Sequence, residues 1–347
     1  MIAVVNKTAD LKASVFPQGG TGMQLFCQDN ETGMDSAAEQ AASLAVRALL
    51  YEVCTTPKPG LVDRNNNGSH RDMDIFTFMR SSASLWPYFA RCFNTGVSSS
   101  GRPAPGTFAS LRPLGIQAEA KMFRATRGIN THKGAIFTIG LACAALGRLC
   151  GMPQQDRDAI SGDPAARILS EISAMTEGTV SKELEGLTKE TARTAGQRFY
   201  LEYGVTGIRG QAEAGFPTVL KFGLPALEQG LSSGKSPDEA GCAAMLQILA
   251  RTTDTNMISR GGRETQMKKA AGLLRLLEKT PQAPPRIRYN ASISSARRTS
   301  SASRSYCCSL YAFRESTETS PACIPFRRHS HCASFSVISP LSNSPCR

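Results

Sequence analysis

Apolar residues recur at helical spacing along most of the chain. In the first such run, Ala42, Ala45, Leu49 and Val53 fall three or four positions apart, the period of a helix with one buried face. Alternating runs of β-branched residues are nearly absent, and no strand–helix–strand order recurs. We therefore predict an all-α fold, a single multi-helix globular domain whose loops carry the polar chemistry. The predicted helices cover residues 35–53, 72–93, 107–126, 131–149, 165–175, 212–228, 237–251 and 263–277.

Composition divides the chain into three parts. Residues 1–34 are glycine-containing and polar, which is typical of a weakly structured leader. Residues 281–347 contain sixteen Ser, seven Pro and no Gly, and they carry +7 of the formal net charge of +12. Prolines at 281, 284 and 285 predict the end of the last helix. We therefore predict an all-α body over residues 35–280, followed by an irregular tail that is disordered or derived from a frameshift.

The eleven cysteines are scattered and form no disulfide framework, which favours the cytoplasm. The apolar run at residues 1–5 is too short for a signal peptide. The longest apolar stretch, residues 134–150, falls short of the roughly 20 residues of a membrane span, so no membrane partner is expected.

Four connectors between the predicted helices carry groups that bind phosphate or transfer protons. The first, residues 56–74, contains Lys58 between two prolines, and it places Ser69 and His70 at the start of a helix, where backbone N–H groups favour an anion. Asp72 and Asp74 are candidate ligands of a hydrated Mg²⁺. The alternative for these two carboxylates is that they only cap the helix.

The second connector, residues 122–134, ends at another helix start. Asn130 or Thr131 is predicted to cap that helix, which places His132 and Lys133 at its positive end. Glu119 adds a carboxylate near the same loop. The alternative is a helical hairpin whose polar residues merely cap.

The remaining two connectors are weaker motifs. Residues 203–217 hold four glycines around Arg209 and Glu213, without matching a P-loop. In residues 251–262, Asp254 and Asn256 supply hard oxygen ligands, and Arg260 suits a phosphate or carboxylate.

Taken together, the connectors make the sequence similar to the triphosphoribosyl-dephospho-CoA synthases, which make the prosthetic-group precursor of citrate lyase and malonate decarboxylase. The resemblance covers roughly residues 36–278 and implies transfer of the 5-triphosphoribosyl group of ATP to the 2′-hydroxyl of 3′-dephospho-CoA, with release of adenine. The product would pass to the acyl carrier protein transferase system. The resemblance rests on EVCTTPKPGLVDRNNNGSHRDMD (52–74), TFMRSS (77–82), RPLGIQAEAKMFRATRGINTHKGAIF (112–137), TAGQRFYLEYGVTGIRGQAEAGFP (194–217) and DTNMISRGG (254–262).

Such a reaction passes through a sugar cation, so it needs a carboxylate near C1, a base for the attacking hydroxyl and a basic cradle for the triphosphate, usually with Mg²⁺. We assign Glu119, Glu213 and His132 to catalysis; a solvated helix face is the alternative for the two glutamates. The expected metal or ribose ligands are Asp72, Asp74, Asp254 and Asn256. The expected substrate- and phosphate-binding residues are Lys58, Arg64, Ser69, His70, Asn130, Lys133, Arg209 and Arg260.

The C-terminal part departs from the family pattern. Family members end in a motif close to SPGGSADLL, which does not occur here, so an inactive frameshifted member is one alternative. Another is a non-catalytic nucleotide- or RNA-binding helical protein with a basic tail that contains Arg297-Arg298 and Arg327-Arg328. The tail lacks the Lys and Gly common in such arms, so nucleic acid is not the expected partner.

Overall fold

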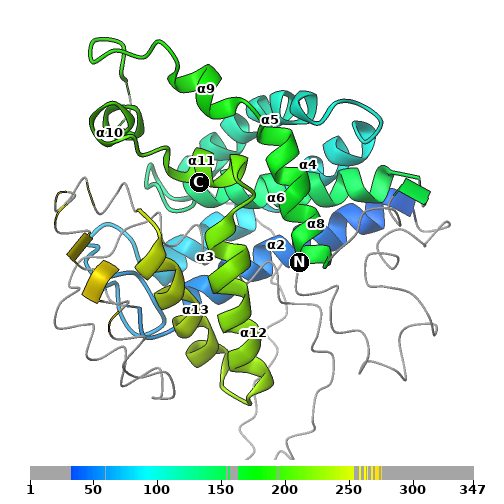
Figure 1. The fold of residues 1–347 in the computed structure, drawn as a ribbon. Coiled ribbons are helices and arrows are strands. Elements are labelled where there is room, and N and C mark those ends of the chain that lie inside the picture. The colour runs from blue at the N-terminus through cyan, green and yellow to red at the C-terminus, as the bar shows by residue number, and fades with distance from the viewer. Residues whose placement is uncertain are drawn as a thin grey trace, which may run out of the picture. The chain divides into compact units, whose positions relative to one another are not determined.

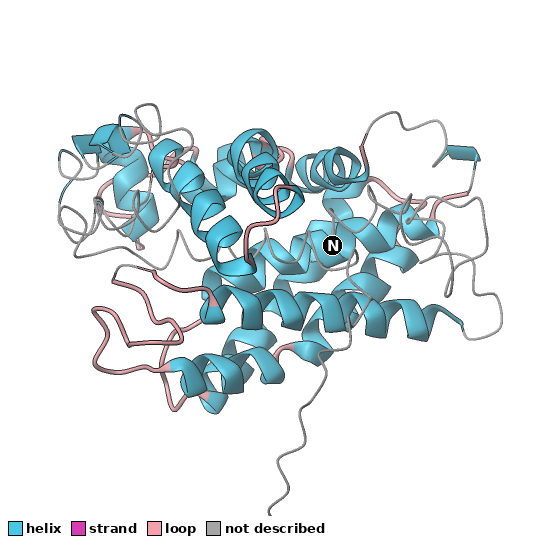
Figure 2. Ribbon diagram, turned by 90° about the horizontal axis from the view of Figure 1, so that it is seen from below, coloured by secondary structure: helices cyan, strands magenta, loops and turns pink. Residues whose placement is uncertain are grey.

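The computed structural model describes residues 33–253 apart from 59, 154, 157–162 and 194, together with scattered positions between 258 and 275. Within this part of the chain, 73% of the residues are helical and none lies in a strand (Figure 2). The predicted all-α class is confirmed. All described residues belong to one compact unit. Most of the predicted leader and the whole predicted tail lie outside the described residues, so that three-part division stays a prediction.

The helices follow the predicted order, with several differences in their bounds. Predicted helices 107–126, 131–149, 165–175 and 237–251 correspond to α5, α6, α8 and α13 within three residues at each end. The elements are α2 (Gly33–Cys54), α3 (Ile75–Ser84), α4 (Trp86–Ser98), α5 (Ala104–Ala125), α6 (Lys133–Gly151), α8 (Pro164–Thr176), α9 (Thr179–Leu184), α10 (Ala195–Tyr203), α11 (Gly207–Glu213), the π-helical turn η1 (Val219–Gly223), α12 (Leu224–Ser232) and α13 (Pro237–Arg251) (Figure 1).

Two of the predicted helices are wrong as single elements. The helix predicted over 72–93 is divided at Leu85, because Pro87 has no backbone N–H and occupies the first turn of α4. The helix predicted over 212–228 is interrupted after α11, where Gly215 and Phe216 adopt positive φ angles. The short helices α9 and α10 were not predicted. Most of residues 263–277 lies outside the described part of the chain.

Helix α6 lies at the centre of the core and is buried almost continuously from Ala135 to Cys150. It packs closely against α4 through glycine. A Cβ on Gly96 would lie 2.1 Å from the carbonyl oxygen of Ala144, and a Cβ on Gly147 would lie 2.1 Å from that of Phe93. By length and composition α6 qualifies as a candidate membrane span, but 83% of the qualifying window is buried inside the protein.

A buried arginine ties the end of α6 to its neighbours. The guanidinium of Arg148 forms an ion pair with Glu171 of α8. It also donates to the hydroxyl of Thr107 at 2.8 Å and to the carbonyl oxygens of Ser99 and Arg102. Because every contact is internal, Arg148 stabilises the fold and does not face a ligand.

Candidate active site

The first connector is folded around the buried carboxylate of Asp63. Its oxygens accept hydrogen bonds from the hydroxyl of Thr56 at 3.0 Å and from the backbone N–H groups of Lys58, Asn65 and Asn66 at 2.8–2.9 Å. This loop lacks the regular backbone hydrogen bonds of a helix or sheet, and the Asp63 carboxylate accepts several of its N–H groups instead. Asp63 therefore fixes the shape of the connector.

Gly68 brings the two ends of this connector together. Its φ is +59°, and a Cβ there would lie 2.5 Å from the backbone of Gly60 and Leu61, so no other residue fits. Both the backbone N–H and the hydroxyl of Ser69 donate to the carbonyl oxygen of Gly60, at 3.2 and 3.1 Å. Ser69, predicted to bind phosphate, closes the loop in this structure.

Lys58, also predicted to bind phosphate, points into the protein. Its ammonium lies 2.7 Å from the carboxylate of Glu52 at the end of α2, and each side chain is only 1% exposed. It also donates to the carbonyl oxygen of Glu52. The pair attaches the connector to α2, and the ammonium is not at the surface.

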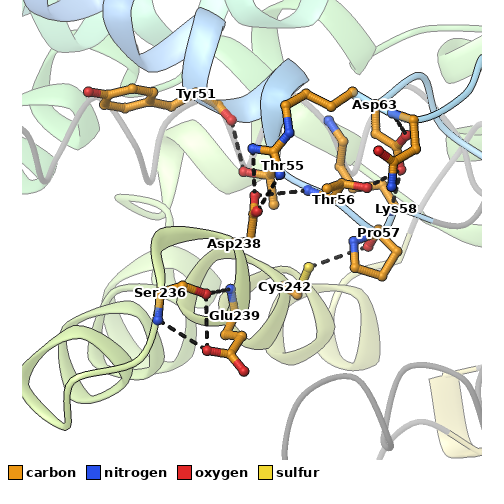
Figure 3. A network of polar contacts seen from close by, with 12 residues as sticks. Tyr51, Thr55, Thr56, Pro57, Lys58, Asp63, Ser236, Asp238, Glu239 and Cys242 are labelled. Carbon is orange, nitrogen blue, oxygen red and sulfur yellow. Dashed lines mark hydrogen bonds and ion pairs between the residues drawn. The ribbon is translucent and has the colours of Figure 1, made fainter. Parts of the chain in front are cut away.

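The same connector is attached to the start of α13 (Figure 3). The carboxylate of Asp238 lies 2.6 Å from the guanidinium of Arg64 and accepts the backbone N–H of Thr56 at 3.1 Å. One turn further along α13, the thiol of Cys242 donates to the carbonyl oxygen of Pro57 at 3.3 Å. The Arg64 side chain is about half exposed, although both of its terminal nitrogens donate to Asp238.

The two predicted metal ligands of this connector lie in different surroundings. Asp74 caps α3. Its carboxylate accepts two hydrogen bonds from Thr77, one from the backbone N–H at 2.7 Å and one from the hydroxyl at 2.6 Å. These hydrogen bonds lower the pKa of Asp74. Asp72 is exposed and lies 3.8 Å from the imidazole of His70. In the part of the chain that the structure describes, no three His, Cys, Asp or Glu side chains group as a metal site.

The second connector meets the first across α3. The hydroxyl of Thr131 donates to that of Ser81 at 2.7 Å, and the Nδ1 atom of His132 lies 2.7 Å from the same oxygen. The His132 ring also meets Phe78 edge to face, with centroids 5.1 Å apart. Phe78 packs against Val53 and Val62, which belong to α2 and to the first connector.

His132 therefore joins two connectors. The residue is 1% exposed, so it positions its neighbours and does not present its ring to solvent. It occupies the N-cap position of α6 without a side-chain cap, and Asn130 accepts the backbone N–H of Lys133 at 3.3 Å. The prediction that Asn130 or Thr131 is the N-cap is therefore wrong, because the helix starts later than predicted.

Charged side chains continue from Lys133 along one face of α5. The ammonium of Lys133 lies 2.9 Å from the carboxylate of Glu119, and both groups are partly exposed. Arg112 lies seven residues before Glu119, so the two share a face of α5 and are about 10 Å apart along its axis. Glu183 of α9 binds Arg112 at 2.7 Å and Arg209 of α11 at 2.6 Å.

These contacts link three of the four predicted connectors. The fourth connector directly follows α13, but Asp254, Asn256 and Arg260 lie outside the described residues. The sequence matches one protein family, ATP:dephospho-CoA triphosphoribosyl transferase, over residues 38–295.

The chain belongs to this transferase family.

Three relatives illustrate the similarity. A protein of Albidiferax ferrireducens named "Probable 2-(5''-triphosphoribosyl)-3'-dephosphocoenzyme-A synthase" is 40% identical over 72% of this chain and 80% of its own length. A Citrobacter koseri protein of the same name is 42% identical over 67% of this chain and 76% of its own length. The 2-(5''-triphosphoribosyl)-3'-dephosphocoenzyme-A synthase of Pectobacterium atrosepticum is 41% identical over 62% of this chain and 68% of its own length. No solved structure matches the fold.

In this transferase, the two candidate catalytic glutamates differ in their surroundings. Glu213 accepts the backbone N–H groups of Gly178 at 2.7 Å and Val180 at 3.1 Å, one on each carboxylate oxygen. It thereby caps the start of α9, where a negative charge matches the helix dipole. The carboxylate of Glu119 instead pairs with a lysine side chain at the surface.

Several residues that shape the candidate site were missed by sequence reasoning. Asp63 had a signal, because an Asp that precedes a run of Asn residues and a Gly, here Asp63 before residues 65–68, is typical of a turn closed by a side chain. Ser81 lies in TFMRSS, one of the motifs that carry the resemblance, but it was not assigned to the site. Asp238 had no signal, since its partner Arg64 is far away in the sequence. Glu183 was missed because α9 has only six residues and no apolar period.

Proposed function

We propose that this transferase moves the 5-triphosphoribosyl group of ATP onto the 2′-hydroxyl of 3′-dephospho-CoA and releases adenine. The observation that carries the proposal is the charged face of α5. There the Glu119 carboxylate lies beside the Lys133 ammonium, about 10 Å along the helix from an arginine pair. A carboxylate suits a sugar cation, and the cations suit a polyphosphate.

The reaction exchanges one bond for another at the ribose of ATP. The bond between C1′ and adenine N9 breaks, and C1′ forms a new bond to the 2′-oxygen of dephospho-CoA. The proton of that hydroxyl is balanced by the proton that adenine gains on leaving. A negative group next to C1′ stabilises the positive charge that develops there in the transition state.

We assign that role to Glu119. Its side chain is 31% exposed and is within reach of a substrate that binds on α5. Glu213, by contrast, already uses both oxygens to cap α9, which makes it a positioning residue for Glu183. His132 is likewise assigned a positioning role, because its buried ring connects Ser81 to the start of α6.

We further propose that Mg²⁺ enters with the triphosphate of ATP, where it would neutralise phosphate charge. The described residues do not supply a complete metal site of their own, so no step is assigned to a resident ion. The exposed Asp72 carboxylate is available as one outer ligand.

The proposed consumer of the product is the acyl carrier protein transferase system of citrate lyase or malonate decarboxylase. The proposed compartment is the cytoplasm, which suits the five described cysteines, since none of them forms a disulfide. Genes adjacent to the coding locus would distinguish the two pathways.

The test is chromatographic detection of adenine. Purified protein is incubated with Mg²⁺ and ATP, with and without 3′-dephospho-CoA. We expect adenine only when dephospho-CoA is present, in equal amount to a new product that retains three phosphates. Salt-sensitive RNA binding with no adenine released would instead support a nucleic-acid-binding protein.

A further inference from the structure

We propose that Arg112 and Arg209 form a polyphosphate subsite, in which Glu183 is a counter-ion that the phosphate chain displaces. This inference deepens the proposed function, because it names the residues that would receive the triphosphate of ATP. Arg112 and Glu183 were not among the residues expected from the sequence.

The geometry brings two guanidinium groups to one carboxylate. Glu183 binds Arg112 through Oε1 at 2.7 Å and the Nε atom of Arg209 through Oε2 at 2.6 Å. The three residues come from α5, α9 and α11, which are neighbours in Figure 1. Two positive charges against one negative charge leave this cluster with a net positive charge.

The arginines are accessible, whereas the carboxylate between them is not. The Arg112 and Arg209 side chains are 55% and 43% exposed, and the Glu183 side chain is 17% exposed. Ion pairs with that much exposure are held weakly, because water screens both charges. A phosphate chain offers each guanidinium several charged oxygens for paired N–H hydrogen bonds. It is therefore a stronger partner for the arginines than the single Glu183 carboxylate.

The position of the cluster also fits an extended anion. Arg112 and Glu119 lie on the same face of α5. The ammonium of Lys133, which pairs with Glu119, lies beside that face. Arg112 is further oriented by the ring of Phe108, whose centroid lies 5.8 Å from the guanidinium carbon. A triphosphate lying along α5 would therefore meet cations at both ends of this face.

The competing explanation is purely structural, in which Glu183 only holds α9 against α5 and α11. The two explanations differ in what happens when the negative charge of Glu183 is removed. A displaced counter-ion competes with phosphate, so Glu183→Gln strengthens anion binding. A structural pair leaves anion binding unchanged or weaker, and it only lowers the thermal stability.

The experiment is calorimetric titration of the full chain with inorganic tripolyphosphate in the absence of nucleotide. We expect Arg112→Ala and Arg209→Ala each to weaken binding by about tenfold, as expected for the loss of one charge-assisted contact. Glu183→Gln tightens binding several-fold, and Arg112→Lys, which keeps the charge but loses the fork, falls between wild type and Arg112→Ala.

Two controls match these changes elsewhere on the surface. Arg91→Ala removes an exposed arginine that bonds to Gln117 at 3.0 Å, and Glu185→Gln removes an exposed carboxylate directly after α9. Both leave tripolyphosphate binding unchanged. Circular dichroism verifies that each variant is folded; if Arg112→Ala fails to fold, Arg209→Ala and Glu183→Gln decide the question.

Unchanged binding in Arg112→Ala and Arg209→Ala, or no tightening in Glu183→Gln, overturns the subsite. The outcome is separable from the proposed function. A wild-type protein that releases adenine while its arginine variants bind tripolyphosphate normally refutes the subsite alone. A protein that binds tripolyphosphate through these arginines but releases no adenine refutes the proposed function alone.

Discussion

The ammonium of Lys133 lies 2.9 Å from the carboxylate of Glu119, and the contact joins the first residue of α6 to the C-terminal half of α5. The two side chains are 57% and 31% exposed. An ion pair that is as exposed to water as this one contributes only about 0–1 kcal/mol to the free energy of unfolding. The pairing is therefore easily replaced by a substrate, and its partners are expected to matter more for turnover than for folding.

Replacement of Lys133 tests the phosphate side of this pair. We predict that Lys133→Ala raises the KM for ATP by about tenfold or more, because a charge-assisted phosphate contact is lost. The melting temperature should stay close to that of wild type. The matched control is Lys221→Ala, which removes an exposed lysine from η1. A wild-type KM in Lys133→Ala would remove this residue from the site.

Replacement of Glu119 tests the carboxylate side. Glu119→Gln keeps the shape of the side chain but loses the charge that stabilises the sugar cation. We predict that kcat falls by about 10²–10⁴-fold, the range typical of a lost catalytic group, with little change in KM. Glu213→Gln, in contrast, should mainly lower the melting temperature, since Glu213 caps α9. A large loss of kcat in Glu213→Gln, together with a lowered melting temperature only in Glu119→Gln, would make Glu213 the catalytic carboxylate and Glu119 the structural one.

The buried ion pair between Arg148 and Glu171 allows a test of the core. We predict that Arg148→Met lowers the free energy of unfolding by roughly 3–5 kcal/mol, because the mostly buried Glu171 carboxylate loses its partner. Urea denaturation measures this change. The double variant Arg148→Met/Glu171→Leu should recover part of the loss. Equal stability of Arg148→Met and wild type would mean that the pair does not hold α6 against α8.

Much of the fold was predictable from local sequence. Helix α6 was found because its apolar run is long, and α13 because its apolar residues recur at helical spacing between polar connectors. In the structure, Ser236 and Glu239 also form a capping box at the start of α13. The division between α3 and α4 was missed although Pro87 was visible, because the apolar period continues across it. Local periodicity thus predicts a helix better than it predicts where the helix is interrupted.

The site was only partly predictable. The connectors were found because their glycines, cations and carboxylates cluster in sequence. The partners of these side chains could not be predicted, because Glu183 and Asp238 come from elements that are distant in the sequence. Lys58 illustrates the limit: next to Pro57 it suggested an exposed cation, but the fold buries it against Glu52. Exposure depends on tertiary packing, which a sequence motif does not specify.

Buried thiols predict how stability depends on pH. Burial raises the pKa of Cys92 and of Cys242 to about 12. In the unfolded chain these thiols ionise near pH 8.5, whereas in the folded protein they stay protonated to about pH 12. The free energy of unfolding is therefore unaffected below about pH 8.5 and falls as the pH rises toward 12, because ionisation stabilises only the unfolded chain. Urea titrations between pH 7.5 and 10.5 measure the slope. Cys242→Ala should make it shallower, and an unchanged slope would contradict this assignment.

The most direct test of the proposed reaction follows both ends of ATP at once. The wild-type protein is incubated with Mg²⁺, 3′-dephospho-CoA and ATP that carries ³²P in the γ-phosphate and ¹⁴C in the adenine ring, and the products are separated by chromatography. The account predicts ³²P in a dephospho-CoA derivative and an equal amount of ¹⁴C in free adenine. Recovery of ³²P as inorganic phosphate, with ¹⁴C in ADP, would contradict it.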